Sequence, residues 1–192
     1  MKKINRLILI LLCFFLFYNF CFSQDTTKNK PKIQHTIYGE FLGNSGLWYN
    51  VGYNCVLKIK DRHKISFSSG LQYFPYLSKI YDSDNNSKQT LAVSNFSFSP
   101  QISYLYGKSH NLEIGVGWVF DFQIDHIENH SNSFTWGIPL NIGYRYQKED
   151  GGLFLKISWN PAYTEFYYID LLKFTPFWGG ASIGYTFKNK KL

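Results

Sequence analysis

Alternation of apolar and polar residues dominates this chain, and it is clearest over residues 134–147. There the even positions are all large and apolar, namely Phe134, Trp136, Ile138, Leu140, Ile142, Tyr144 and Tyr146. The odd positions are small or polar, namely Thr135, Gly137, Pro139, Asn141, Gly143, Arg145 and Gln147. A period of two predicts a β-strand with two different faces. An apolar face with aromatic ends and a small, polar face are typical of a strand between lipid and a crowded lumen.

The same pattern recurs along the chain. We predict eight strands, over about residues 36–43, 47–59, 64–73, 92–106, 112–123, 134–147, 153–160 and 177–187. Apart from the short first connection, long loops (76–90, 124–133 and 161–176) alternate with tight turns after the second, fourth and sixth strands. An even strand number with short turns on one side and long loops on the other indicates an up-and-down membrane barrel. Pro100 and Pro139 predict bulges, because proline cannot donate to a β-ladder.

The composition of the polar face decides which face points inward. A soluble ligand-binding barrel would turn its apolar face inward and show many Lys and Glu side chains to water. Here the polar face carries scattered Ser and Asn and many glycines: Gly52, Gly70, Gly115, Gly117, Gly137, Gly143, Gly180 and Gly184. Small residues suit the narrow lumen of an eight-stranded barrel. We therefore predict an all-β fold, an eight-stranded antiparallel up-and-down transmembrane β-barrel with an aromatic girdle at each end.

The N-terminus predicts export. Three cations (Lys2, Lys3 and Arg6) precede an apolar run that ends near Ser23, as in a secretory signal peptide. A retained membrane helix is the less favoured alternative, because the run is shorter than the ~20 residues of a span. The expected organisation is a cleaved signal over 1–23, a flexible periplasmic lead over 24–35, the barrel over 36–188 and a basic periplasmic tail over 189–192.

Charge and cysteine content exclude two further classes. The formal charge of +7 falls to +4 without the three cations of the predicted signal, and the rest form no basic stripe. We therefore expect no nucleic-acid partner. Cys55 is the one cysteine that follows the predicted signal, so the mature chain cannot form an internal disulfide.

The last predicted strand carries the most specific motif. Its residues Gly180, Ile183, Tyr185 and Phe187 resemble the C-terminal assembly signal of outer-membrane barrels, although five residues, Lys-Asn-Lys-Lys-Leu, follow. Over about residues 36–187 the chain resembles the small eight-stranded outer-membrane barrels common in Bacteroidota. The resemblance implies a bacterial outer-membrane location with both termini periplasmic, contact with membrane lipid and handling by the barrel-assembly machinery. Such barrels include adhesins, stability proteins and lipid-modifying enzymes, so the resemblance implies a cellular location and a fold but not a function.

Charged residues on the polar face are the first candidate site. They are Glu40, Lys58, Glu113, Asp121, Arg145 and Lys156. They could form a path for protons or ions, or an ion-pair network that fills the lumen. We favour the network, because buried charges persist when they are paired and a barrel of this size has little room for water.

A metal site and an enzyme site are weaker hypotheses. Asp125, His126, Glu128 and His130 could hold a cation, but this spacing in a loop fixes no geometry, and we expect no metal or cofactor. A lipid-modifying enzyme needs a nucleophile, a base and an orienting acid. Three histidines, His35, His63 and His110, fall at periplasmic positions without a matching serine and carboxylate in sequence.

The predicted outer loops are the remaining candidates. One of them carries exposed aromatic residues that could anchor a partner or simply cap the rim: Tyr163, Phe166, Tyr167, Tyr168 and Phe174. Our leading hypothesis is a monomeric, non-enzymatic outer-membrane barrel whose loops 76–90, 124–133 and 161–176 contact an extracellular or envelope partner or stabilise the envelope. The alternatives are a narrow pore for ions or small solutes and a lipid-modifying enzyme.

Overall fold

The computed structural model describes residues 33–43, 49–81, 88–125, 133–164, 174–175 and 178–187. Side chains are described over 33–43, 49–75, 94–124, 134–163 and 178–187. All of these residues belong to one compact unit, Ile33–Leu192. The predicted signal peptide, most of the predicted lead and the basic tail lie outside the described residues and remain predictions.

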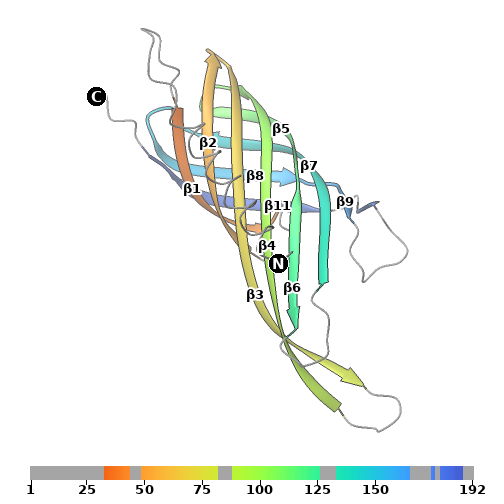
Figure 1. The fold of residues 1–192 in the computed structure, drawn as a ribbon. Coiled ribbons are helices and arrows are strands. Elements are labelled where there is room, and N and C mark those ends of the chain that lie inside the picture. Colours follow the sequence, from red (N-terminus) through yellow and green to blue (C-terminus); the bar gives the residue numbers. More distant parts are fainter. Residues whose placement is uncertain are drawn as a thin grey trace, which may run out of the picture. The chain divides into compact units, whose positions relative to one another are not determined.

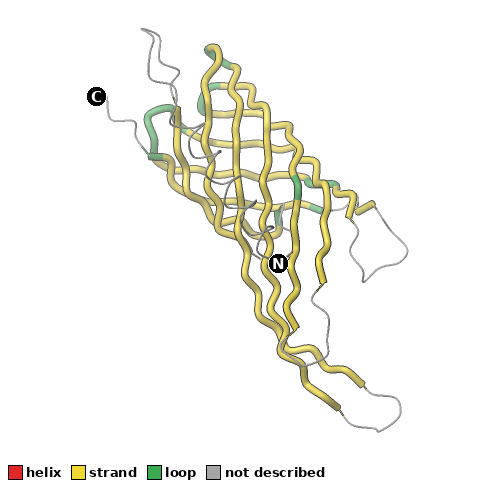
Figure 2. The backbone as a smooth tube through the Cα atoms, in the orientation of Figure 1, coloured by secondary structure: helices red, strands yellow, loops and turns green. Residues whose placement is uncertain are grey.

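The described chain is a single antiparallel sheet (Figures 1 and 2). Its strands are β1 (Ile33–Leu42), β2 (Tyr49–Lys60), β3 (His63–Tyr81), β4 (Lys88–Gly107), β5 (His110–Gly117), β6 (Val119–Asp125), β7 (Ser133–Gln147), β8 (Gly152–Trp159), β9 (Ala162–Thr164), β10 (Phe174–Thr175) and β11 (Gly179–Thr186). Neighbouring strands around the ring are hydrogen-bonded to each other, and β1 pairs with β11 from Thr36↔Thr186 to Leu42↔Gly180. The sheet therefore closes on itself. No helix among the described residues is long and apolar enough to cross a membrane.

The eleven strands form a ring of eight barrel strands, which we call staves. Three staves are each divided into two shorter strands, namely β5 and β6, β8 and β9, and β10 and β11. β5 and β6 both pair with β4 and β7, and their register resumes across Trp118 without a slip. The division lies opposite Pro100, which accepts from the Trp118 N–H but has no N–H to return. β8 and β9 likewise share one register on β7. The fold class predicted from the sequence is confirmed, but the bulges predicted at Pro100 and Pro139 are wrong, since both ladders pass these prolines in register.

The boundaries of the staves differ from the prediction. The barrel begins at Ile33 and not at residue 36. Most of the predicted loop 76–90 is strand, because the β3–β4 ladder continues to Tyr81↔Lys88. In Figure 1 this hairpin projects well beyond the other strands. Loop 161–176 also contains the short strands β9 and β10, and loop 124–133 loses its two ends to β6 and β7. Cross-strand pairing overrides the polar composition of these segments, which was the basis for predicting loops.

Burial is inverted relative to a water-soluble protein. The large apolar residues form the exposed outer wall. Examples with 59–68% of their surface exposed are Val51, Leu112, Ile114, Ile157 and Ile183. The buried residues are mainly polar, with Thr36, Asn54, Ser66, Asn141 and Asn160 fully enclosed. The alternation of faces predicted from the sequence is therefore confirmed. The lumen is the polar core of the barrel.

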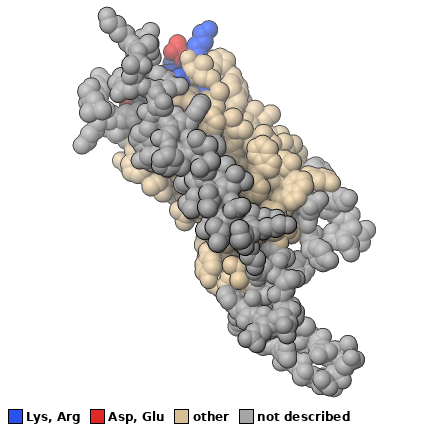
Figure 3. Space-filling view, viewed as in Figure 1, with Lys and Arg blue, Asp and Glu red and all other residues tan. Residues whose placement is uncertain are grey.

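Charge is absent from the described part of the outer wall. Where side chains are described, the exposed Lys, Arg, Asp and Glu residues all lie in the three tight turns: Lys60, Asp61, Arg62, Lys108, Lys148 and Asp150. Figure 3 shows the same separation on one face, where the visible charged residues gather at the upper end. We call this the turn end of the barrel.

One row of the lumen alternates small and large residues across four strands. Gly52 on β2 is opposite Tyr38 on β1, which is opposite Gly184 on β11, which is opposite Phe154 on β8. The rings of Tyr38 and Phe154 have centroids 5.5 Å apart. A Cβ on Gly52 would lie 2.2 Å from Tyr38 Cζ, so the glycines provide the space that the two rings occupy. This packing explains why the polar face is rich in glycine.

Replacing a lumen glycine should therefore be costly, whereas its outer neighbour should tolerate the same change. A Cβ at Gly184 would lie 2.3 Å from the Ile37 carbonyl oxygen, while one at Gly39 meets nothing within 4 Å. We expect Gly184→Ala to lower the free energy of unfolding by about 1–3 kcal/mol. Gly39→Ala, one register position away on the lipid face, should change it by less than ~0.5 kcal/mol. Urea unfolding from lipid vesicles measures both, and equal values would contradict this packing.

Candidate functional site

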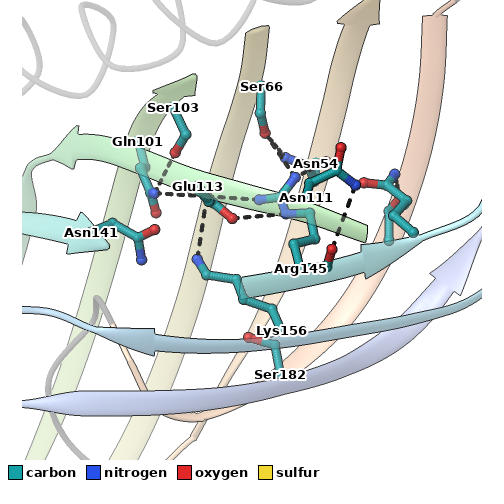
Figure 4. Close-up of polar contacts among 12 residues, drawn as sticks. Asn54, Ser66, Gln101, Ser103, Asn111, Glu113, Asn141, Arg145, Lys156 and Ser182 are labelled. Carbon is teal, nitrogen blue, oxygen red and sulfur yellow. Dashed lines mark hydrogen bonds and ion pairs between the residues drawn. The ribbon is translucent and has the colours of Figure 1, made fainter. Parts of the chain in front are cut away.

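Arg145 on β7 is the centre of the polar network in the lumen (Figure 4). Its guanidinium forms two parallel bonds to Glu113 on β5, from Nε to Oε2 and from Nη2 to Oε1, both at 2.8 Å. The remaining nitrogen, Nη1, donates to Ser66 Oγ at 3.1 Å and to Asn54 Oδ1 at 3.3 Å. Arg145 thus joins β7 to β5, β3 and β2 across the lumen. Paired donors in this fork geometry give the strongest kind of carboxylate bond.

Glu113 has a second cation. Lys156 Nζ on β8 lies 3.7 Å from Glu113 Oε1, and Gln101 Nε2 on β4 donates to the same oxygen at 3.3 Å. All three charged side chains are at most 4% exposed. The face of the Phe154 ring lies 5.3 Å from the Arg145 guanidinium carbon, a cation–π distance. We call Glu113, Arg145 and Lys156 the central ion cluster.

A second polar layer separates the central ion cluster from the turn end. Lys64 on β3 donates to Asn111 Oδ1 at 3.1 Å and also to the Lys108 carbonyl. Gln147 Nε2 donates to Thr36 Oγ1 at 3.0 Å, and Thr36 contacts Thr186 across the β1–β11 seam. This layer was missed as a site in the sequence analysis, although the alternation does place Lys64 on the inward face. The sequence does indicate this layer, because Lys64 lies two positions before Ser66 and so faces the same side of the strand. A lysine that points inward must find hydrogen-bond acceptors in the lumen.

The six charged residues predicted as one network occupy four separate places. Glu113, Arg145 and Lys156 lie together. Glu40 accepts from Asn50 Nδ2 at 2.7 Å and Ser182 Oγ at 3.1 Å. Asp121 accepts from Ser97 and Asn95, and Lys58 of β2 pairs with Glu149 of the β7–β8 turn at 3.0 Å. The separation follows from register, which sets the height of each inward residue along the barrel axis.

Most of the other candidates lie at the edge of the described chain or beyond it. Among the metal candidates, His126, Glu128 and His130 are outside the described residues, as is the side chain of Asp125. In the aromatic loop, Phe166, Tyr167 and Tyr168 are outside, Tyr163 is an exposed residue of β9, and only the backbone of Phe174 in β10 is described. In the assembly motif Ile183, Tyr185 and Phe187 all point outward, whereas Gly180 lies on the lumen side against Gly43.

Three histidines occupy equivalent places near the turn end. The ring nitrogen Nδ1 of His35, His63 and His110 is hydrogen-bonded to a tyrosine hydroxyl on the next strand, that of Tyr53, Tyr104 and Tyr144 respectively. The Nδ1 atom of each imidazole thus has a phenol as its partner. These contacts differ from the serine–histidine–carboxylate contacts of an acyl-transfer enzyme.

Comparison with known proteins adds structural neighbours of low similarity. No family model matches the sequence, and no curated protein is detectably similar to it. The N-terminal barrel domain of Pseudomonas aeruginosa OprF aligns at 12% identity and TM-score 0.42, covering 81% of this chain and 96% of that one. A major outer-membrane protein of Thermus thermophilus aligns at 13% identity and TM-score 0.49, covering 82% of this chain and 99% of that one. Neisserial surface protein A aligns at 13% identity and TM-score 0.41, covering 82% of this chain and 96% of that one.

The contacts of the central ion cluster cross-link several strands. We therefore expect its loss to lower the stability of the barrel. Glu113→Gln removes the carboxylate that Arg145 and Lys156 share and leaves two cations buried together. We expect the free energy of unfolding to fall by about 3–5 kcal/mol, the usual effect of breaking a buried ion pair.

The matched control is the partly exposed pair of Lys58 in β2 and Glu149 in the β7–β8 turn. Lys58→Met breaks the bond to Glu149, where both side chains are 28% exposed, and should cost less than about 1 kcal/mol. Urea titration in the same vesicles measures both variants. A Glu113→Gln protein as stable as Lys58→Met would show that the cluster does not hold the strands together.

Proposed function

We propose that this protein is an integral barrel of the bacterial outer membrane, without enzymatic activity, that presents a projecting β-hairpin and its loops outside the cell. The observation that supports it best is the uncharged apolar wall that surrounds a closed, polar lumen. A closed sheet leaves no backbone group unpaired in lipid, and this is a condition that any spanning sheet must meet.

The proposed orientation places the turn end in the periplasm. Tight turns face the periplasm in outer-membrane barrels, and longer connections face outward. The first and last strands also meet at the turn end, where the Phe187 N–H donates to the His35 carbonyl. Both termini would therefore be periplasmic.

The β3–β4 hairpin supports a role outside the membrane. β3 has 19 residues, and at ~3.3 Å per residue and a tilt of about 45° a strand of this length rises roughly 45 Å, against an apolar band of about 25 Å. The neighbouring β6 supports β4 as far as Val93↔Asp125. Beyond that point β3 and β4 are paired with each other as far as Tyr81↔Lys88. We infer that this ribbon reaches past the membrane surface and provides the contact region for an extracellular or envelope partner.

The contacts in the lumen favour this role over a pore. Arg145 and its partners cross the lumen from β7 to β2, β3 and β5, and the Tyr38 and Phe154 rings pack beside them at a tilt. A continuous water path would require these bonded side chains to move apart. The wild-type protein should accordingly give no current steps in planar bilayers. Steady currents that fall in Lys156→Met would instead support the narrow pore.

The proposed membrane location can be tested directly by electrophoresis. We expect the protein without residues 1–23 to insert into phospholipid vesicles and to migrate differently on a gel before and after boiling, because the folded barrel binds less detergent than the unfolded chain. The unfolded chain in urea is the control. Identical migration, together with water solubility, would overturn the proposal.

The proposed orientation can be tested by labelling single cysteines in cells. In a Cys55→Ser background, Asn85→Cys lies in the 82–87 connection of the long hairpin and Asp150→Cys in the β7–β8 turn. A membrane-impermeant maleimide should label Asn85→Cys in intact cells, and Asp150→Cys once the outer membrane has been permeabilised. The reverse result would show the opposite orientation.

A further inference from the structure

The apolar wall ends at the turn end in two copies of one side-chain arrangement. His63 begins β3 opposite Tyr106 of β4, and His110 begins β5 opposite Tyr146 of β7. Each imidazole packs against that opposite ring, with centroids 5.3 and 5.1 Å apart. Each is also hydrogen-bonded through Nδ1 to the tyrosine two positions away, Tyr104 or Tyr144. Because β3, β4, β5 and β7 are consecutive in the ring, the two copies lie side by side on one wall.

Each histidine–tyrosine pair keeps one hydrogen-bond donor. A neutral imidazole carries one N–H and a tyrosine one O–H, and their mutual bond uses only one of these two donors. The other donor, either the tyrosine O–H or the imidazole N–H, remains for a further hydrogen bond in either imidazole tautomer. Tyr104 and Tyr144 are 41% and 44% exposed, His110 is exposed and His63 is half-buried, so the donor lies at the surface of the barrel in either tautomer. The two pairs therefore present two donors at the edge of the apolar wall.

Positive charge lies next to both pairs. Arg62 directly precedes His63, and Lys108 lies two residues before His110. Both cations are exposed, as is Lys60, and the exposed acid in these two turns is Asp61. In the proposed membrane location, the aromatic residues at this height mark the change from hydrocarbon to headgroups outside the wall. A group that fits there should be anionic, accept hydrogen bonds and be attached to acyl chains.

We propose that the pairs His63–Tyr104 and His110–Tyr144, with Arg62 and Lys108, bind the phosphate groups of phospholipids in the leaflet at the turn end. The phosphate accepts the spare donor of a pair and is attracted by the adjacent cation. The acyl chains lie along the exposed apolar residues of the same strands, such as Leu112 and Ile114. This site rests on the proposed membrane location, which it extends to a class of lipid.

The count of donors predicts a distinctive mutational result. Removing either member of a pair leaves one donor, because the surviving residue keeps its own. His63→Phe or Tyr104→Phe alone should therefore retain most phospholipid binding, and the double variant should lose it. Phenylalanine keeps the aromatic packing in each case. For each pair we expect the double variant to reduce phospholipid preference roughly three- to tenfold, the effect of about one hydrogen bond.

Native mass spectrometry can measure this preference. The protein is released from mixed micelles of phosphatidylglycerol and digalactosyldiacylglycerol with the same acyl chains, and the lipids that remain bound are counted. Wild-type protein should retain phosphatidylglycerol preferentially, and His63→Phe/Tyr104→Phe and His110→Phe/Tyr144→Phe should not. The control is Tyr185→Phe, another exposed tyrosine at the turn end whose register neighbours are Ile37 and Leu153. Equal retention of both lipids by wild type, or an equal loss in the control, would overturn the site.

A second measurement needs no variant. The imidazole ¹⁵N shifts of His63 and His110 should differ between nanodiscs of phosphatidylglycerol and of the galactolipid, and unchanged shifts would overturn the site. Inorganic phosphate added to galactolipid discs should not reproduce the change, since it lacks acyl chains. If it does, the ligand is free phosphate and the lipid assignment is wrong. A protein that fails to insert into any bilayer contradicts the proposed function, whereas one that inserts without lipid preference contradicts only this site.

Discussion

The requirement that every backbone N–H and C=O be paired controls this structure. A sheet with an apolar outer face cannot leave an edge in lipid, because each unpaired group there costs several kcal/mol. The pairing of β1 with β11 removes both edges in one step and brings residues about 150 positions apart into register. Closure then forces each strand to divide its side chains between lipid and a narrow lumen. The inverted burial pattern follows from this division.

The narrow lumen imposes the second constraint. Polar and charged side chains that point inward lose water and must find partners among themselves. Arg145 meets this need with five donors in a planar fork, which reach a carboxylate, a hydroxyl and an amide on three other strands. Glycines opposite Tyr38 leave room for the rings of Tyr38 and Phe154. Among the described residues, these bonds and ring contacts join β7 to β2, β3 and β5 across the lumen.

The two ends of the barrel differ physically. The turn end is short, carries the exposed charges among the residues with described side chains, and has paired histidines and tyrosines on its outer face. The opposite end is extended on one side by the β3–β4 ladder. The two ends therefore differ both in chemistry and in length. The barrel between them fixes their separation and orientation.

Parity along the sequence was sufficient to predict an antiparallel barrel of eight staves and the two faces of the strands that the structure describes. The reason is local: in a strand, successive side chains alternate, so an apolar run at every second position identifies a face without knowledge of any partner. Thus Tyr38 and Lys156 could be placed inside and Ile183 outside from the sequence alone. The glycine content of the polar face then indicated that this face lines the lumen and that the apolar face contacts lipid.

Only the tertiary structure decided which inward residues meet. Glu113 and Arg145 are 32 residues apart, and Glu40 joins Ser182 and not the central ion cluster, because the relative heights of the strands around the ring depend on register and tilt. The same applies to the long β3–β4 ladder, whose polar sequence reads as a loop until each strand supplies hydrogen bonds to the other. It applies also to the histidine–tyrosine pairs, which lie on different strands and acquire their common geometry from the pairing of β3 with β4 and of β5 with β7.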